Sequence, residues 1–362
     1  MPTIHQFVPT LLKSDAVGSH VLEIAKVFEA NGIESEIFVN QRQDDHVGIA
    51  HLYSDYPRMR KDGDILLYHV ASASPMADFL ASRKERIMID YHNITPAHFF
   101  RGWDDRTSDI LDLARMQLQR LSDITSFAMA DSEFNRNELD ELGFSETAVV
   151  PILFGQDNVL TNTSPIQNLK RADHAGKGPT WLFVGRITPC KAQHNLIAAF
   201  AAYRSSYAEN AKLILVGKPS PQSYFDALGS LAEELEVADS VMLTNGVSAE
   251  QLQAYYAEAD VFVSLSEHEG FCVPLLEAMH QGLPVVALAS SAVPETLGNS
   301  GLLLERSDPF EVAAAVDLIL SNLQIQSELL GRSRTRMSEL SLEKSTQSLL
   351  SALRRASVIP GA

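Results

Sequence analysis

The 362-residue sequence contains only two cysteines and no long apolar run. Cys190 and Cys272 stand far apart and form no C-x-x-C pair, so neither a disulfide framework nor a zinc knuckle is expected. No stretch reaches the roughly 18 apolar residues needed to span a bilayer, and residues 1–15 lack the basic and apolar regions of a signal peptide. We therefore expect a cytoplasmic protein that does not cross a membrane.

Basic residues are also scarce, because 29 Lys and Arg stand against 46 Asp and Glu, giving a net charge of −17. Such an acidic surface repels the phosphate backbone that dominates nucleic-acid binding, so nucleic acid is not an expected partner. Peripheral contact with the cytoplasmic face of the inner membrane stays open, since short basic clusters can lie beside lipid despite the overall charge. The candidates are Arg58, Arg60 and Lys61, and Arg83, Lys84 and Arg86.

Several motifs that carry chemistry are missing. There is no G-x-G-x-x-G and no G-x-x-x-x-G-K-[ST], so a Rossmann dinucleotide site and a P-loop are unsupported. No H-E-x-x-H and no G-x-S-x-G occur either, which argues against a zinc protease and a serine hydrolase. Asp62 and Asp64 flank a glycine just before an apolar run, which is turn composition rather than a metal site. We expect neither a metal nor an organic cofactor.

What the sequence does have is a repeated alternation of short apolar runs with helix-length amphipathic stretches. This pattern predicts an α/β fold with mostly parallel sheets, and the length suits two Rossmann-like domains. The expected strands are 4–8, 36–39, 65–69, 86–91, 127–130, 148–152, 180–184, 212–216, 240–243, 261–265, 284–287 and 301–304. The expected helices are 19–31, 106–121, 193–207, 223–235, 249–258, 274–281, 309–322 and 342–355.

The two series define the expected domains. Residues 1–160 form the first domain and residues 180–341 the second. Residues 161–179 are rich in Asn, Thr, Lys and Gly without an apolar period, which indicates a connection. Residues 342–362 are expected to add an amphipathic helix that packs back toward the first domain.

The richest segment runs from Ser264 to Met279, an apolar strand that passes through a glycine-containing turn into a helix starting near Pro274. Glu269 and Glu277 are eight positions apart, so both can face one cleft and accept hydrogen bonds from sugar hydroxyls. The alternative is that they merely favour the helix dipole. Backbone N–H groups just before the helix suit an anionic or hydroxyl-rich ligand, and they belong to Gly270, Phe271, Cys272 and Val273.

Two cations stand near the start of the second domain. Arg186 and Lys191 follow an expected strand at its carboxyl end, where open α/β sheets bind ligands, and together they suit a diphosphate. In the first domain, Gly18 opens a helix and would let a phosphate approach the backbone closely. His92 follows a strand and can enter the cleft, although a histidine there is as often structural.

Taken in order, these residues resemble the retaining glycosyltransferases of family 4, which have the GT-B fold. The family's signature of two glutamates separated by seven residues matches Glu269 and Glu277, and its V-G-R…K segment matches Arg186 and Lys191. Further matching segments are 213–217, 293–296, 301–304 and 130–134. The sequence departs from the family's glycine-rich loop, because Asp15 and Ala16 replace the first two glycines before Gly18 and His20.

The resemblance implies two Rossmann-like domains facing a central cleft, with the acceptor held by the first domain and a nucleotide-sugar such as a UDP- or GDP-hexose held by the second. It gives Arg186 and Lys191 the leaving diphosphate, Glu277 the ribose hydroxyls and Glu269 the sugar hydroxyls. His92 would face the sugar. The remaining donor-binding residues would be Gly18, Gly217, Val247 (near the base), Gly270, Phe271, Cys272 and Val273. No metal is implied.

The resulting expectation is a retaining, metal-independent hexosyltransferase that acts on a saccharide or lipid-linked saccharide, similar to bacterial enzymes that build lipopolysaccharide and other surface polysaccharides. A sugar epimerase or a phosphorylase-like enzyme shares the cleft but does not fit this glutamate signature or this chain length. The main alternative is a catalytically inactive GT-B-like protein that only binds nucleotide-sugars.

Overall fold

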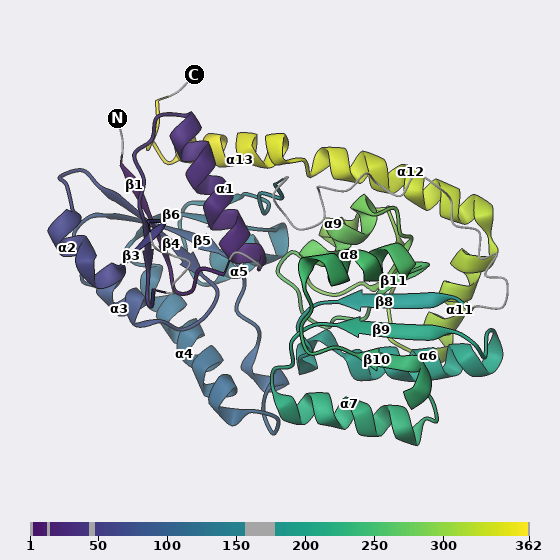
Figure 1. The fold of residues 1–362 in the computed structure, drawn as a ribbon. Coiled ribbons are helices and arrows are strands. Elements are labelled where there is room, and N and C mark those ends of the chain that lie inside the picture. Colours follow the sequence, from purple (N-terminus) through teal and green to yellow (C-terminus); the bar gives the residue numbers. More distant parts are fainter. Residues whose placement is uncertain (1–2, 13–14, 43–47, 156–177, 361–362) are drawn as a thin grey trace. The chain divides into compact units, whose positions relative to one another are not determined.

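The computed structural model describes residues 3–12, 15–42, 48–155 and 178–360. The chain divides into two compact units, each built on its own parallel sheet (Figure 1). Unit 1 comprises Met1–His98, Arg106–Asn158 and Leu340–Ala362, and unit 2 comprises Phe99–Asp105 and Val159–Glu339. The predicted α/β fold with two Rossmann-like domains is confirmed. Most of the expected connection, residues 161–177, lies outside the described residues.

The sheet of unit 1 has the strand order β3-β2-β1-β4-β5-β6-β7, with every pairing parallel. Its central strands are mostly apolar and almost entirely buried, as expected for a parallel sheet that is covered on both faces. In the pairing of β4 with β5, His69 lies opposite Asp90, which brings both side chains to the carboxyl edge of the sheet. The strands are β1 (Ile4–Val8), β2 (Ile37–Val39), β3 (Ala50–Leu52), β4 (Ile65–Val70), β5 (Arg86–Tyr91), β6 (Thr125–Ala130) and β7 (Thr147–Val149).

Helices cover both faces of this sheet. On one face, Ile24 of α1 and Leu353 of α13 share a buried cluster with the strands. On the other face, Phe7 of β1 contacts Tyr56 of α2 and Phe79 of α3. The helices are α1 (Ala16–Ala30), α2 (Tyr56–Met59), α3 (Pro75–Ala81), α4 (Asp105–Leu121), α5 (Glu133–Glu141) and α13 (Leu342–Arg355). Short 3-10 turns are Tyr53–Asp55 and Ala97–Phe99.

The sheet of unit 2 has the parallel order β10-β9-β8-β11-β12-β13. Trp181 of β8 packs with Phe200 of α6 in the main core, while Phe262 of β11 stacks on Tyr256 of α8 on the opposite face. The strands are β8 (Thr180–Val184), β9 (Lys212–Val216), β10 (Val241–Leu243), β11 (Val261–Ser264), β12 (Val285–Leu288) and β13 (Leu302–Leu304). The helices are α6 (Gln193–Ser206), α7 (Gln222–Glu234), α8 (Ala249–Glu258), α9 (Val273–His280), α10 (Val293–Leu297), α11 (Pro309–Ser321) and α12 (Leu323–Glu339), with 3-10 turns at Pro189–Lys191 and Ala238–Ser240.

The segment Phe99–Asp105 belongs to unit 2, although the sequence places it inside the expected first domain, 1–160. The reason is packing: the ring of Trp103 meets that of Tyr224 edge-on at 5.2 Å, and the Ser223 hydroxyl donates to the Trp103 carbonyl at 3.1 Å.

No helix in the described part of the chain is both long enough and apolar enough to cross a membrane.

Candidate functional site

The predicted glutamate segment forms the turn between β11 and α9. Pro274 stands in the first turn of α9, and the cap residue Cys272 adopts a left-handed conformation, with φ of 69°. The turn is fixed from the loop before α10, since the Glu269 N–H donates to the Ser291 hydroxyl at 2.7 Å. The Thr296 hydroxyl donates to the Phe271 carbonyl. These bonds hold the backbone of the turn without using the Glu269 carboxylate.

Lys191 and Glu269, both predicted site residues, form an ion pair. The Lys191 Nζ lies 2.7 Å from Glu269 Oε2, and the two side chains are only 17% and 11% exposed. Lys191 Nζ also donates to the His268 carbonyl at 3.3 Å. Burial works against the ammonium, but the charge of Glu269 outweighs it and raises the pKa of Lys191. Lys191 is therefore a fixed cation beside the start of α9.

The two other charged residues of the predicted donor site differ in their surroundings. Arg186 is exposed after β8, and no described residue pairs with its guanidinium group. Glu277 lies on α9, and its Oε2 accepts a hydrogen bond from the Tyr256 hydroxyl at 2.8 Å. Burial raises the pKa of Glu277 to about 7, against the opposing effect of that hydrogen bond. Arg186 is thus free for an anion, while Glu277 is held by one oxygen.

The residues of unit 2 predicted to contact the donor through their backbone differ in their surroundings. A Cβ atom on Gly217 would lie 1.8 Å from the Gly185 carbonyl oxygen, so this close approach of two loops needs a glycine. Val247 is half-buried in the loop that leads to α8. Gly270 and Val273 are half-buried, and Phe271 and Cys272 are each 7% exposed. The assignment of these residues to donor binding stays a prediction.

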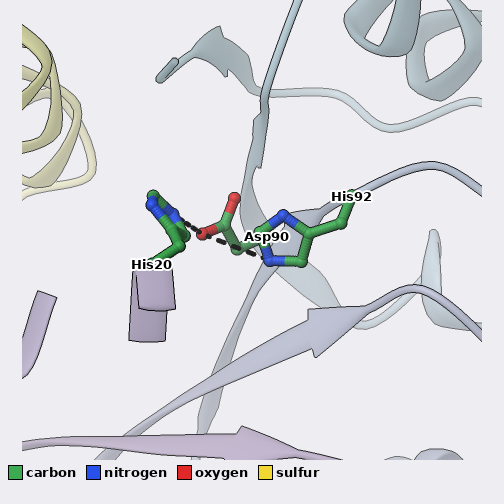
Figure 2. Close-up of side chains that lie close together, drawn as sticks. All are labelled: His20, Asp90 and His92. Carbon is green, nitrogen blue, oxygen red and sulfur yellow. Dashed lines mark hydrogen bonds and ion pairs between the residues drawn. The ribbon is translucent and has the colours of Figure 1, made fainter. Parts of the chain in front are cut away.

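Unit 1 contains a buried cluster of histidines and carboxylates at the carboxyl edge of its sheet. Figure 2 shows His20 of α1, Asp90 of β5 and His92 just after β5 around one carboxylate. Asp90 Oδ2 lies 3.0 Å from His20 Nε2 and 3.8 Å from His92 Nε2. His92 Nδ1 lies 3.0 Å from Asp131, and its Nε2 lies 3.0 Å from His69 Nδ1. Both ring nitrogens of His92 are therefore used within unit 1.

The hydrogen bonds define where the protons lie. His92 Nδ1–H donates to Asp131, and His69 is bonded on one side to His92 and on the other to Gln6 Oε1 at 3.0 Å. Burial opposes a charged His92, but Asp131 and Asp90 outweigh it and raise the pKa of His92 to about 9. Burial lowers the pKa of His69 far below its usual value. His92 is thus the cation of the cluster, and it donates through Nε2 to a neutral His69.

Ligand atoms of His20, Asp90 and His92 lie within 4.8 Å of one another, which is close enough to consider a metal ion. A histidine that binds a metal through one nitrogen must donate a proton through the other. His20 does the reverse, because its Nδ1 accepts the Leu153 N–H at 2.9 Å, and its Nε2 therefore carries the proton shared with Asp90. The donor set fits a hydrogen-bonded network and does not fit a metal.

Two predicted residues of unit 1 are already engaged. The Gly18 N–H donates to the Asp15 side chain at 2.6 Å, and a Cβ on Gly18 would lie 1.9 Å from the Leu12 carbonyl oxygen. The close approach that Gly18 permits is thus made to Leu12, and its contact with a phosphate stays a prediction. The sugar-facing role of His92 stays a prediction as well, with both ring nitrogens bonded to protein.

The basic triplets expected as membrane contacts are largely matched by carboxylates or held by neutral groups. Arg60 pairs with Glu85, and Lys61 pairs with Glu34. Arg83 also pairs with Glu85. Arg86 donates to the Ser126 hydroxyl and to the Ala356 carbonyl. These triplets therefore do not present a continuous unpaired basic patch.

Some residues of the histidine–carboxylate cluster in unit 1, and some that contact Glu269 or Glu277 in unit 2, were not predicted from the sequence. Asp90 lies near the end of β5 and His92 follows one residue after it, so their spacing of two residues was a usable signal that they lie on the same side. His69 gave none, because it lies within an apolar run that is typical of a buried strand, and Tyr256 gave none, because it is one of two adjacent tyrosines in an amphipathic helix. Asp131 and Ser291 contribute through contacts between segments far apart in the sequence.

Comparison with known proteins gives a consistent family match. The family model described as Glycosyl transferases group 1 matches residues 166–339. A GDP-mannose-dependent alpha-(1-6)-phosphatidylinositol monomannoside mannosyltransferase of Mycobacterium tuberculosis is 28% identical over 279 residues, which cover 73% of this chain and 69% of that protein. The O-antigen chain mannosyltransferase B of Escherichia coli is 28% identical over 253 residues, covering 69% and 64%.

Solved structures extend the likeness to the fold of the whole chain. The crystal structure of Anabaena HepE in complex with UDP and glucose superposes with a TM-score of 0.73, at 18% identity, and covers 98% of this chain and 100% of that one. The likeness therefore includes unit 1, which the family model does not cover.

Proposed function

We propose that this chain, a group 1 glycosyltransferase with the GT-B fold, moves a hexose-type sugar from a UDP- or GDP-hexose to a saccharide or lipid-linked saccharide, with retention at the anomeric carbon. Relatives named as mannosyltransferases of phosphatidylinositol mannoside and of O-antigen chains support a role in glycoconjugate or polysaccharide synthesis. The observation that carries the proposal is the Lys191–Glu269 ion pair beside the start of α9, with Glu277 on that helix.

Each charged residue has a role in this reaction. Arg186 and Lys191 neutralise the diphosphate as the bond between the anomeric carbon and the phosphate oxygen breaks. Glu269 accepts hydrogen bonds from hydroxyls of the donor sugar, and Glu277 accepts them from the ribose. The acceptor hydroxyl forms the new bond on the same face of the sugar, and its proton passes to the departing phosphate oxygen.

The chemistry needs no metal in this proposal, since protein cations and backbone N–H groups meet the developing charge. The test is a thermal-shift and transfer screen with UDP-glucose and GDP-mannose, with and without EDTA. We expect one donor to raise the melting temperature and to release sugar slowly in EDTA. NMR identifies the anomer of the sugar that is released first. An anomer with the same configuration as the donor indicates retention.

Arg186→Ala is the variant to test, because Arg186 is exposed and we expect its loss to leave the fold unchanged. It should abolish both the thermal shift and the release of sugar. Binding of a donor without any turnover would support the inactive binding protein instead. An absence of binding to every donor would refute the proposed donor site.

A further inference from the structure

Tyr256 is placed to control Glu277. The tyrosine lies on α8 with none of its surface exposed, and its ring stacks on Phe262 with centroids 6.3 Å apart. Its hydroxyl donates to Glu277 Oε2 at 2.8 Å. No described residue hydrogen-bonds to Glu277 Oε1. The carboxylate is therefore anchored through one oxygen, and the other is available to a ligand.

Burial and the hydrogen bond from Tyr256 shift the pKa of Glu277 in opposite directions, and burial is the larger effect. Burial raises the pKa of Glu277 to about 7, and the hydrogen bond from Tyr256 acts in the opposite direction. Burial, together with Glu277, raises the pKa of Tyr256 well above its usual value, so the phenol remains a neutral donor. Without that donor, the buried carboxylate would take up a proton at higher pH.

The other titratable or charged groups near Glu277 are either neutral or bound to groups other than its carboxylate. Burial raises the pKa of the Cys272 thiol well above its usual value, so the thiol is neutral. Lys191 pairs with Glu269. Arg336 of α12, a helix packed against α9, donates to the main-chain carbonyls at Glu295 and Thr296. The pH response of Glu277 therefore depends on Tyr256.

We propose that Tyr256 is a positioning residue of the donor site, whose hydroxyl holds one oxygen of Glu277 so that the other accepts a ribose hydroxyl of the nucleotide-sugar. This inference rests on the proposed function, in which Glu277 binds the ribose. An ionised carboxylate is a stronger acceptor than a protonated one, so donor affinity follows the ionisation that Tyr256 maintains.

The test is Tyr256→Phe, which removes one oxygen and keeps the ring. Calorimetry with GDP-mannose and UDP-glucose measures affinity from about pH 6 to about pH 8.5. Wild-type affinity should fall as the pH drops through about 7. Loss of one hydrogen bond to a charged group raises the pKa of Glu277 by roughly one to two units, so affinity should be about tenfold weaker near pH 7 but only about twofold weaker near pH 8.5.

Two controls separate the explanations. Tyr203→Phe removes the same atom from a tyrosine packed on Trp181 in the core, and it should leave affinity unchanged at every pH. Glu277→Gln should weaken binding and flatten the pH profile. If Glu277→Gln binds donor normally, the proposed donor site itself is wrong. If Glu277→Gln weakens binding while Tyr256→Phe gives no deficit, or a deficit independent of pH, the positioning role is wrong.

A second measurement covers the case in which Tyr256→Phe does not fold. Replacing tyrosine with 3-fluorotyrosine during expression makes each phenol a stronger hydrogen-bond donor. The midpoint of the pH profile should then move below that of the unlabelled protein. An unmoved midpoint refutes the role of the Tyr256 hydroxyl.

Discussion

The Lys191–Glu269 pair gives a quantitative prediction for the stability of unit 2. Exposed ion pairs contribute about 0.2–1 kcal/mol, whereas removing one partner of a fully buried pair costs about 3–5 kcal/mol. With side chains 17% and 11% exposed, this pair lies between these limits. We expect Lys191→Met to lower the free energy of unfolding by about 2 kcal/mol, because it leaves the Glu269 carboxylate without its cation.

The matched changes complete a double-mutant cycle. Glu269→Gln should cost about 1–2 kcal/mol, since the ammonium keeps its hydrogen bond to the His268 carbonyl. The double variant should cost less than the sum of the two by about 1–2 kcal/mol, which is the coupling energy of the pair. Additivity of the two changes would refute the view that the ion pair stabilises the turn.

Tryptophan fluorescence during urea unfolding is suited to this cycle. The chain has two tryptophans, and both lie in unit 2. Trp181 is fully buried in β8, and Trp103 lies in the segment that packs on Tyr224. The fluorescence signal therefore follows the unit that contains the pair, even where unit 1 unfolds at a different urea concentration.

Three further predictions follow from the geometry. Arg186→Ala should change stability by less than about 0.5 kcal/mol while removing donor binding, and a melting temperature lowered along with affinity would contradict its assignment as a free surface cation. Gly217→Ala places a Cβ 1.8 Å from a carbonyl oxygen and should cost about 2 kcal/mol or more, whereas Gly229→Ala, with open space around it in α7, should be neutral or stabilising; equal urea midpoints for the two would count against the contact. Asp90→Asn should lower the pKa of His92 from about 9, as read by NMR titration, since it removes one of the carboxylates that raise this pKa. Because the folded pKa of His92 is raised, its contribution to stability is complete below about pH 6.5 and is lost as the pH rises through about 9, and Asp90→Asn should reduce that loss.

The sheets could be predicted largely from the sequence because their strands are short, mostly apolar runs. The expected and observed bounds coincide for β1, β5, β8 and β9. The strand β3 was missed because it has three residues, includes a histidine and is half-buried at the sheet edge. The helix α5 was missed because only Asn135 and Leu139 of its nine residues are buried, so it has no apolar period. Its start depends on the Ser132 cap, a weak signal in isolation.

The sequence singles out individual residues of the candidate site but not the contacts between them. Residue type and strand position indicated Lys191 and Glu269, but their ion pair joins two loops far apart in the sequence. Likewise, His92 was singled out as a histidine after a strand, whereas its charge depends on Asp131. Tertiary packing determines which distant residues come into contact, and the periodicity of a single sequence does not indicate these contacts.

Arg186 and Lys191 differ in whether they already form an ion pair, and this difference affects how a nucleotide-sugar would be bound. A diphosphate is an anion, and of the two predicted donor-site cations Arg186 has no ion pair with a described residue, whereas Lys191 is already paired with Glu269. Under the proposed function, Glu269 gains hydrogen bonds from sugar hydroxyls as Lys191 gains a phosphate partner, so each charge exchanges partners without being left bare. A buried charge without a partner is costly, and this exchange avoids that state. The intact donor should therefore bind better than the nucleoside diphosphate alone, because only the sugar provides Glu269 with new partners.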